Sequence, residues 1–147
     1  MIYSLKKGNV QLSKNFKLSE FACKDGSDLV IVDSKLVLDL QTLRDKIGKA
    51  INITSAYRSP AYNKQCGGIE HSEHIKGKAA DIQVAGVSPL DVAKKADALK
   101  LFNGIGVYPT FTHLDIGDYK GYWYQDSHGK KTFYKSLAAL EKAVFNK

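Results

Sequence analysis

The chain has 147 residues, of which 44% are hydrophobic, 10% aromatic and 25% charged, as is usual for a soluble globular protein. These values exclude a disordered chain, a collagen-like repeat and a disulfide scaffold. The length predicts a single domain over residues 1–147 without an appended module.

The net charge of +7 is concentrated at the two ends of the chain. Residues 1–24 carry five lysines and one acid, and residues 120–147 carry six lysines and two acids. Basic ends favour a polyanionic partner, such as an anionic cell-wall polymer. Nucleic acid is not expected, because no helix combines clustered basic residues with base-reading side chains.

No segment is typical of a membrane span or of a secretory leader. The longest apolar run, 29–32, is far shorter than the roughly 20 residues that cross a bilayer. The first residues lead directly into Lys6 and Lys7 without an apolar core or a cleavage site. We therefore expect synthesis in the cytoplasm and no membrane partner. Cys23 and Cys66 are expected to be free thiols.

Apolar residues recur every three or four positions over residues 34–48, which predicts a helix with Ser34 as its cap and Gly48 at its end. Further helices are predicted to begin at Ser59-Pro60 and Ser88-Pro89, ending near residues 67 and 103, and over 136–145. Strands are predicted over 51–55, 79–84, 104–108 and 111–116. This mixed order predicts an α+β fold, with a small antiparallel sheet and flanking helices.

Two of the predicted strands place polar side chains together on one face. Asp81 faces away from its apolar neighbours, and His113 and Asp115 share one face of their strand. Together with His74, these residues could supply the three ligands that a catalytic zinc requires. The alternative, two ordinary half-buried histidines and a strand-edge acid, remains open on spacing alone.

The motif Ser72-x-His74-x-x-Gly77-x-Ala79-x-Asp81, followed by His113-Leu114-Asp115, resembles the zinc signature of the D-Ala-D-Ala metallocarboxypeptidases, which share their fold with hedgehog N-terminal domains. Residues 55–60 with Asn63 and Gly67-Gly68, and residues 15–21, resemble further segments of that family. The resemblance covers residues 10–118 and implies the hedgehog/DD-peptidase fold.

The resemblance also implies roles for individual residues. His74, Asp81 and His113 would bind one zinc ion per chain, and the metal would activate water for attack on a peptide bond. Arg58 would stabilise the developing oxyanion or bind a substrate carboxylate. Ser72 and His71 are candidates for contact with substrate.

Asp115 has two possible roles, and the sequence does not decide between them. Some family members carry an acid three residues before the last ligand, where this chain has Thr110, which cannot act as a base. Asp115 is then the available general base, or it hydrogen-bonds a ligand histidine from outside. Glu73 is a reserve candidate. The aromatic cluster 119–124 could line a substrate groove, but is assigned to the core.

The expected function is therefore that of a zinc peptidase acting on stem peptides of bacterial peptidoglycan, as a carboxypeptidase or an endopeptidase. We expect a monomer that reaches the cell wall after release, for example during phage or prophage lysis. The alternative is a zinc-containing binding module of the same fold without catalysis.

Overall fold

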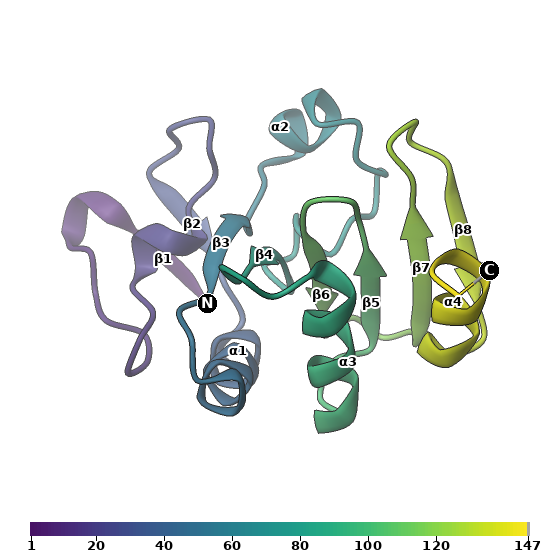
Figure 1. Cartoon of the computed structure of the whole chain (residues 1–147). Helices are drawn as coiled ribbons and strands as arrows, with labels where there is room; N and C mark the ends of the chain where they lie inside the picture. The colour runs from purple at the N-terminus through teal and green to yellow at the C-terminus, as the bar shows by residue number, and fades with distance from the viewer. Residues whose placement is uncertain (147) are drawn as a thin grey trace.

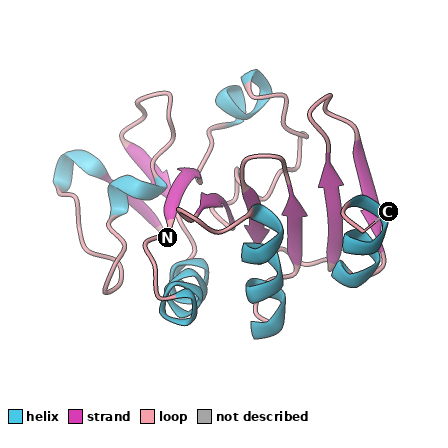
Figure 2. Cartoon of the chain, viewed as in Figure 1, coloured by secondary structure: helices cyan, strands magenta, loops and turns pink. Residues whose placement is uncertain are grey.

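A six-stranded mixed sheet organises the structure, a computed structural model that describes residues 1–146 (Figures 1 and 2). Its strands lie in the order β3, β4, β6, β5, β7, β8. They span β3 Asn52–Ser55, β4 Ala79–Gln83, β5 Gly104–Val107, β6 Thr112–Asp115, β7 Gly121–Gln125 and β8 Lys131–Tyr134. All neighbours are antiparallel except β5 and β7, which are parallel. The predicted α+β class is confirmed, although the sheet is larger than expected and has this one parallel pair.

Helices cover one face of the sheet and leave the other face open (Figure 1). They are α1 Ser34–Ile47, α3 Pro89–Leu99 and α4 Leu137–Val144, while the short α2 Pro60–Gln65 lies apart at the top of the view. Alternate strand residues, among them Ile82, Ile105 and Leu114, are fully buried in the core. The residues between them, including Asp81 and His113, therefore face the opposite side.

Most of the predicted helix boundaries agree with the structure. The hydroxyls of Ser59 and Ser88 accept backbone N–H bonds and so cap α2 and α3, as expected. At α1, however, Asp33 caps and Ser34 is the first helical residue. The α3 helix ends at residue 99, because Lys100 adopts a left-handed conformation that closes its last turn.

Two strand pairs were absent from the sequence prediction. Strands β1 Ile2–Ser4 and β2 Leu29–Ile31 form a separate antiparallel ribbon, with 3₁₀ turns at Leu5–Lys7 and Leu18–Phe21. Strands β7 and β8 form a hairpin at the edge of the main sheet. No helix within residues 1–146 is long and apolar enough to cross a membrane. Both cysteines are free, as predicted, with Cys23 buried and Cys66 exposed.

Candidate metal centre

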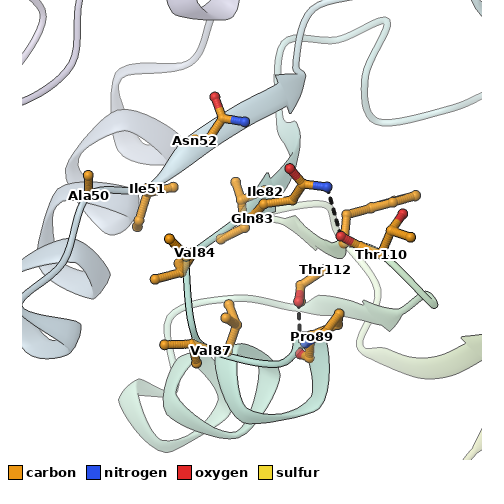
Figure 3. A pocket seen from close by; sticks show the side chains of 13 residues that line it. Ala50, Ile51, Asn52, Ile82, Gln83, Val84, Val87, Pro89, Thr110 and Thr112 are labelled. Carbon is orange, nitrogen blue, oxygen red and sulfur yellow. Dashed lines mark hydrogen bonds between the residues drawn. The ribbon is translucent and has the colours of Figure 1, made fainter.

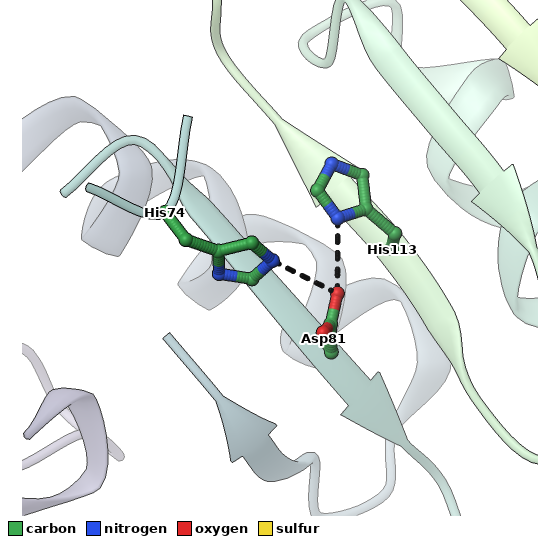
Figure 4. A group of neighbouring side chains, drawn as sticks. All are labelled: His74, Asp81 and His113. Atoms are coloured by element: carbon green, nitrogen blue, oxygen red, sulfur yellow. Dashed lines mark hydrogen bonds and ion pairs between the residues drawn. The ribbon is translucent and has the colours of Figure 1, made fainter. Parts of the chain in front are cut away.

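The open face of the sheet brings the three predicted ligands together. Asp81 on β4 is the direct cross-strand partner of His113 on β6. His74 comes from the loop that leads into β4, and its ring lies edge-on to that of His113, with 5.1 Å between centroids. Figure 4 shows both imidazoles pointing at the Asp81 carboxylate. All three residues are buried.

The loop before β4 fixes the orientation of His74. Its Nδ1 lies 2.7 Å from the carbonyl oxygen of Ala56, so Nδ1–H donates there and Nε2 is free to bind. Nε2 lies 3.3 Å from Asp81 Oδ1. The loop turns back at Gly77, where φ is +73° and a Cβ would overlap the Ile31 carbonyl, which explains the glycine of the motif.

His113 is held between two carboxylates. Its Nδ1 lies 2.9 Å from Asp81 Oδ1, and its Nε2 lies 2.8 Å from Asp115 Oδ2. The other oxygen of Asp115 accepts the backbone N–H of Gly117 at 3.0 Å. The Asp115 carboxylate fits because Gly104 on β5 has no side chain; a Cβ there would overlap it. Asp115 thus lies behind His113, on the opposite side of the ring from Asp81.

Arg58 is engaged by protein groups at the floor of the site. Its guanidinium donates to Asp81 Oδ2 at 3.1 Å, to Ser55 Oγ at 3.0 Å and to Asn63 Oδ1 at 3.3 Å. It therefore neutralises the rear oxygen of Asp81 and leaves Oδ1 facing the histidines. Asn63 is held close by Gly68, whose Cβ would overlap the amide.

The site holds a surplus of negative charge when its histidines are neutral, because two carboxylates face one guanidinium. Burial opposes ionisation of Asp81, but hydrogen bonds from His113 and His74 hold the pKa of its carboxyl well below its usual range. Burial also opposes a charge on His113, yet hydrogen bonds to Asp115 and Asp81 raise the pKa of His113 to about 9. Burial lowers the pKa of His74, which stays neutral at pH 7. At pH 7 the proton on His113 offsets this surplus in the metal-free site, and a bound cation would take the place of that proton.

The donor set fits a divalent metal. One donor atom from each of His74, Asp81 and His113 lies within 4.8 Å of the other two. Two imidazole nitrogens and one carboxylate oxygen are ligands that zinc accepts, and a three-residue set leaves a coordination position open for water or substrate. Both imidazoles also have the outer hydrogen-bond partner that ligand histidines usually have.

A cleft of about 590 Å³ opens over this cluster. Its lining includes Arg58, Ser72 and His71, so the structure brings all predicted site residues to one place. Ser72 is buried, and its hydroxyl accepts the N–H of His74 at 3.2 Å, whereas His71 is exposed. The lining also includes Tyr108, Tyr119 and Trp123, which the sequence offered as possible groove residues. Phe111, Lys131 and Phe133, which also line the cleft, were not candidates from the sequence.

The aromatic cluster 119–124 is divided between the two faces of the sheet. Tyr122 is buried in the core, as expected, but Tyr119 and Trp123 line the cleft. Alternation along β7 explains this division, since Tyr122 and Trp123 point to opposite faces. Assigning the whole cluster to the core was therefore wrong, and recognising β7 as a strand would have revealed the split.

A second cavity of about 570 Å³ lies at the other end of β4 (Figure 3). Its lining is largely apolar, with Ile51, Ile82, Val84, Val87 and Val92 as main contributors. None of its lining residues is a histidine, cysteine, aspartate or glutamate. This cavity therefore lacks the groups that metal binding or acid–base chemistry would need.

Comparisons with known proteins agree with this geometry. The sequence profile of the peptidase M15 family matches residues 14–115. The probable peptidoglycan L,D-endopeptidase MepK of Haemophilus influenzae is 40% identical over 74 residues, which cover 46% of this chain and 39% of that protein. Peptidoglycan L,D-endopeptidase MepK of Escherichia coli K12 is 30% identical over 95 residues, which cover 58% of this chain and 52% of that protein. The chain thus matches about half or less of each relative's length, and by the family match it belongs to the peptidase M15 family of metallopeptidases.

Proposed function

We propose that this chain is a zinc-dependent endopeptidase that hydrolyses a peptide bond in bacterial peptidoglycan stems. The observation that carries the proposal is the buried His74, Asp81 and His113 cluster at the floor of an open cleft. The similarity to two peptidoglycan L,D-endopeptidases supports the substrate class and favours an internal bond over a terminal one.

His74, Asp81 and His113 would hold the zinc ion, which would supply Lewis-acid chemistry, lowering the pKa of water and polarising a peptide carbonyl. The protein's own groups prepare the site for that chemistry. The Ala56 carbonyl and the Asp115 carboxylate each accept a hydrogen bond from one ring N–H of a ligand histidine, which directs the other ring nitrogen toward the metal position. Arg58 holds Asp81 in place through Oδ2. We assign Arg58 and Asp115 as positioning residues.

Asp115 is a poor candidate for the general base, because both of its oxygens already accept hydrogen bonds within the protein. Glu73 lines the cleft, and its Oε2 is buried without a partner among residues 1–146. Its other oxygen lies 3.3 Å from Lys76 Nζ. The reserve candidate from the sequence thus keeps an acceptor oxygen without a hydrogen bond, which Asp115 lacks.

The positive charge of the two terminal segments suggests where the protein works. The two basic terminal segments lie at opposite ends of the molecule (Figure 1), and the C-terminal one contributes Lys131 to the lining of the cleft. An anionic cell-wall polymer could contact both ends while a stem peptide enters the cleft. We propose that the protein works as a monomer with one zinc ion, at the cell wall after release.

Digestion of purified peptidoglycan, with mass analysis of the fragments, tests the function. Zinc-loaded protein should create new peptide ends, and chelated protein or His113→Ala should create none. His128→Ala is the matched control, since His128 is exposed in a turn far along the chain from the cluster, and it should cleave normally. Bound zinc without cleavage would contradict the proposal and favour a non-catalytic binding module.

A further inference from the structure

A single cross-strand row connects the metal cluster to the edge of the sheet. Asp81 pairs with His113, His113 with Gly106, Gly106 with Trp123, and Trp123 with Phe133. Residues paired in this way point to the same face, so the row runs along the floor of the cleft. The cleft therefore continues past the candidate ligands toward β7 and β8.

The row forms an aromatic surface because its middle position is glycine. Trp123 extends across Gly106 to within 5.0 Å of the His113 ring, measured between centroids. A Cβ on Gly106 would lie 2.5 Å from the indole. The indole N–H donates to the Tyr108 hydroxyl at 3.1 Å, which fixes the ring. On the side of Trp123 away from His113 lies Phe133, which is 66% exposed. The centroids of the Phe133 and Trp123 rings are 5.8 Å apart.

A lysine completes this surface. Lys131 shares the open face of β8 with Phe133, and its Nζ lies 5.3 Å from the centroid of the Trp123 ring. The other cations of the cleft are already engaged, Arg58 by Asp81 and Lys76 by Glu73. Within residues 1–146, Lys131 has no carboxylate partner. Its charge remains available to a ligand.

We infer that Trp123, Phe133 and Lys131 form a subsite for an acidic peptide segment, whose free carboxylate binds Lys131 while its apolar atoms pack on the two rings. The inference rests on the proposed peptidase function. The centroid of the Trp123 ring lies 5.0 Å from that of His113 and 5.3 Å from Lys131 Nζ. Nζ therefore lies at most about 10 Å from the ligand ring, which corresponds to no more than about three residues of extended peptide. The subsite thus selects substrates with a carboxylate no more than about three residues from the scissile bond.

A matched pair of synthetic stem peptides tests the subsite. One peptide carries a free carboxylate three residues from the scissile bond, and the other carries a carboxamide there. With zinc-loaded protein at low salt, Lys131→Gln should raise KM for the carboxylate peptide about threefold to fivefold and leave kcat unchanged. It should not change KM for the carboxamide. Lys130→Gln, a neighbouring exposed lysine outside the cleft lining, should match the wild type on both peptides.

Binding can be measured separately from catalysis. Trp123 is the only tryptophan of the chain, so its fluorescence reports directly on the subsite. In chelated protein, the carboxylate peptide should quench or shift this emission at lower concentrations than the carboxamide, and Lys131→Gln should remove the difference.

The subsite would be overturned, and the proposed function left intact, if wild type and Lys131→Gln showed the same difference in KM and in fluorescence between the carboxylate and the carboxamide peptide. Fluorescence discrimination that depends on Lys131, together with no hydrolysis of either peptide by zinc-loaded wild type, would support the subsite and contradict the proposed function. The two failures are therefore distinguishable.

Discussion

Replacing Asp115 by asparagine separates the two roles that this residue could have. The Asp115 carboxylate accepts one hydrogen bond from His113 and another from the Gly117 backbone, each through its own oxygen. Asparagine has only one acceptor oxygen. Its side-chain NH2 group would therefore face the N–H of either His113 or Gly117, and one of the two hydrogen bonds would be lost. Losing a buried hydrogen bond to a charged group costs about 1.5–3 kcal/mol.

For a residue that orients a metal ligand, this cost should reduce zinc affinity about 10-fold to 100-fold. Competition with a chromophoric chelator would measure the affinity of Asp115→Asn against the wild type. Asp118→Asn, at an exposed carboxylate on the following segment, is the control and should bind zinc normally.

Peptide hydrolysis at saturating zinc completes this test. A positioning role predicts a kcat within about tenfold of the wild type once the site is filled, whereas loss of a general base costs about 100-fold to 10,000-fold. Unchanged zinc affinity combined with a kcat loss of that larger size would refute the positioning role and make Asp115 the base.

Three further perturbations follow from the same contacts. Gly106→Ala should displace the Trp123 ring, shift its fluorescence and raise KM, while Gly121→Ala, whose Cβ would meet no atom within 4 Å, should do neither. Arg58→Met should lower the unfolding free energy of the metal-free protein by about 3–5 kcal/mol in denaturant titrations, because it leaves a buried carboxylate without its cation; a change below about 1 kcal/mol would contradict the pairing. The pKa of His113 is raised to about 9 in the metal-free fold, so protonation of this residue stabilises the fold fully below about pH 6.5. As the pH rises through 9, the unfolding free energy should fall by up to about 3 kcal/mol. Zinc-loaded protein should not show this fall in melting temperature, and a flat profile for chelated protein would exclude the raised pKa.

The local signals in the sequence were sufficient for the core of the fold, and the resemblance to a known family supplied the candidate ligands. Alternation along residues 79–84 and 111–116 placed Asp81 and His113 each on the polar face of its own strand, and the structure pairs them directly. Serine-proline caps located α2 and α3. These signals work because strand alternation and helix capping depend on neighbouring residues.

The sequence contains no local signal for strands that pair with partners distant in the chain. Strands β1 and β2 are three residues each and are separated by more than twenty residues, so neither shows a local pattern. The β7 strand is defined by its parallel pairing with β5, and β8 lies at the sheet edge with mostly exposed residues. Without this hairpin, the cleft wall containing Trp123 and Lys131 could not be predicted.

The hydrogen-bond partners of the site also depend on tertiary structure. The sequence suggested that Arg58 extends toward substrate, but the guanidinium is turned onto Asp81 and Asn63. The place of Asp115 behind His113 depends on the absence of a side chain at Gly104 on the adjacent strand. These contacts join residues 5 to 23 positions apart and become visible only in the folded chain.

Titration of chelated protein with zinc, followed by peptide hydrolysis, tests the central claim most directly. If His74, Asp81 and His113 form one catalytic metal centre, activity should rise from zero and level off at one zinc per chain. Asp81→Asn should fail to reach this plateau at the same zinc concentrations. Full activity in chelated protein, or a plateau that Asp81→Asn reaches equally well, would contradict the account.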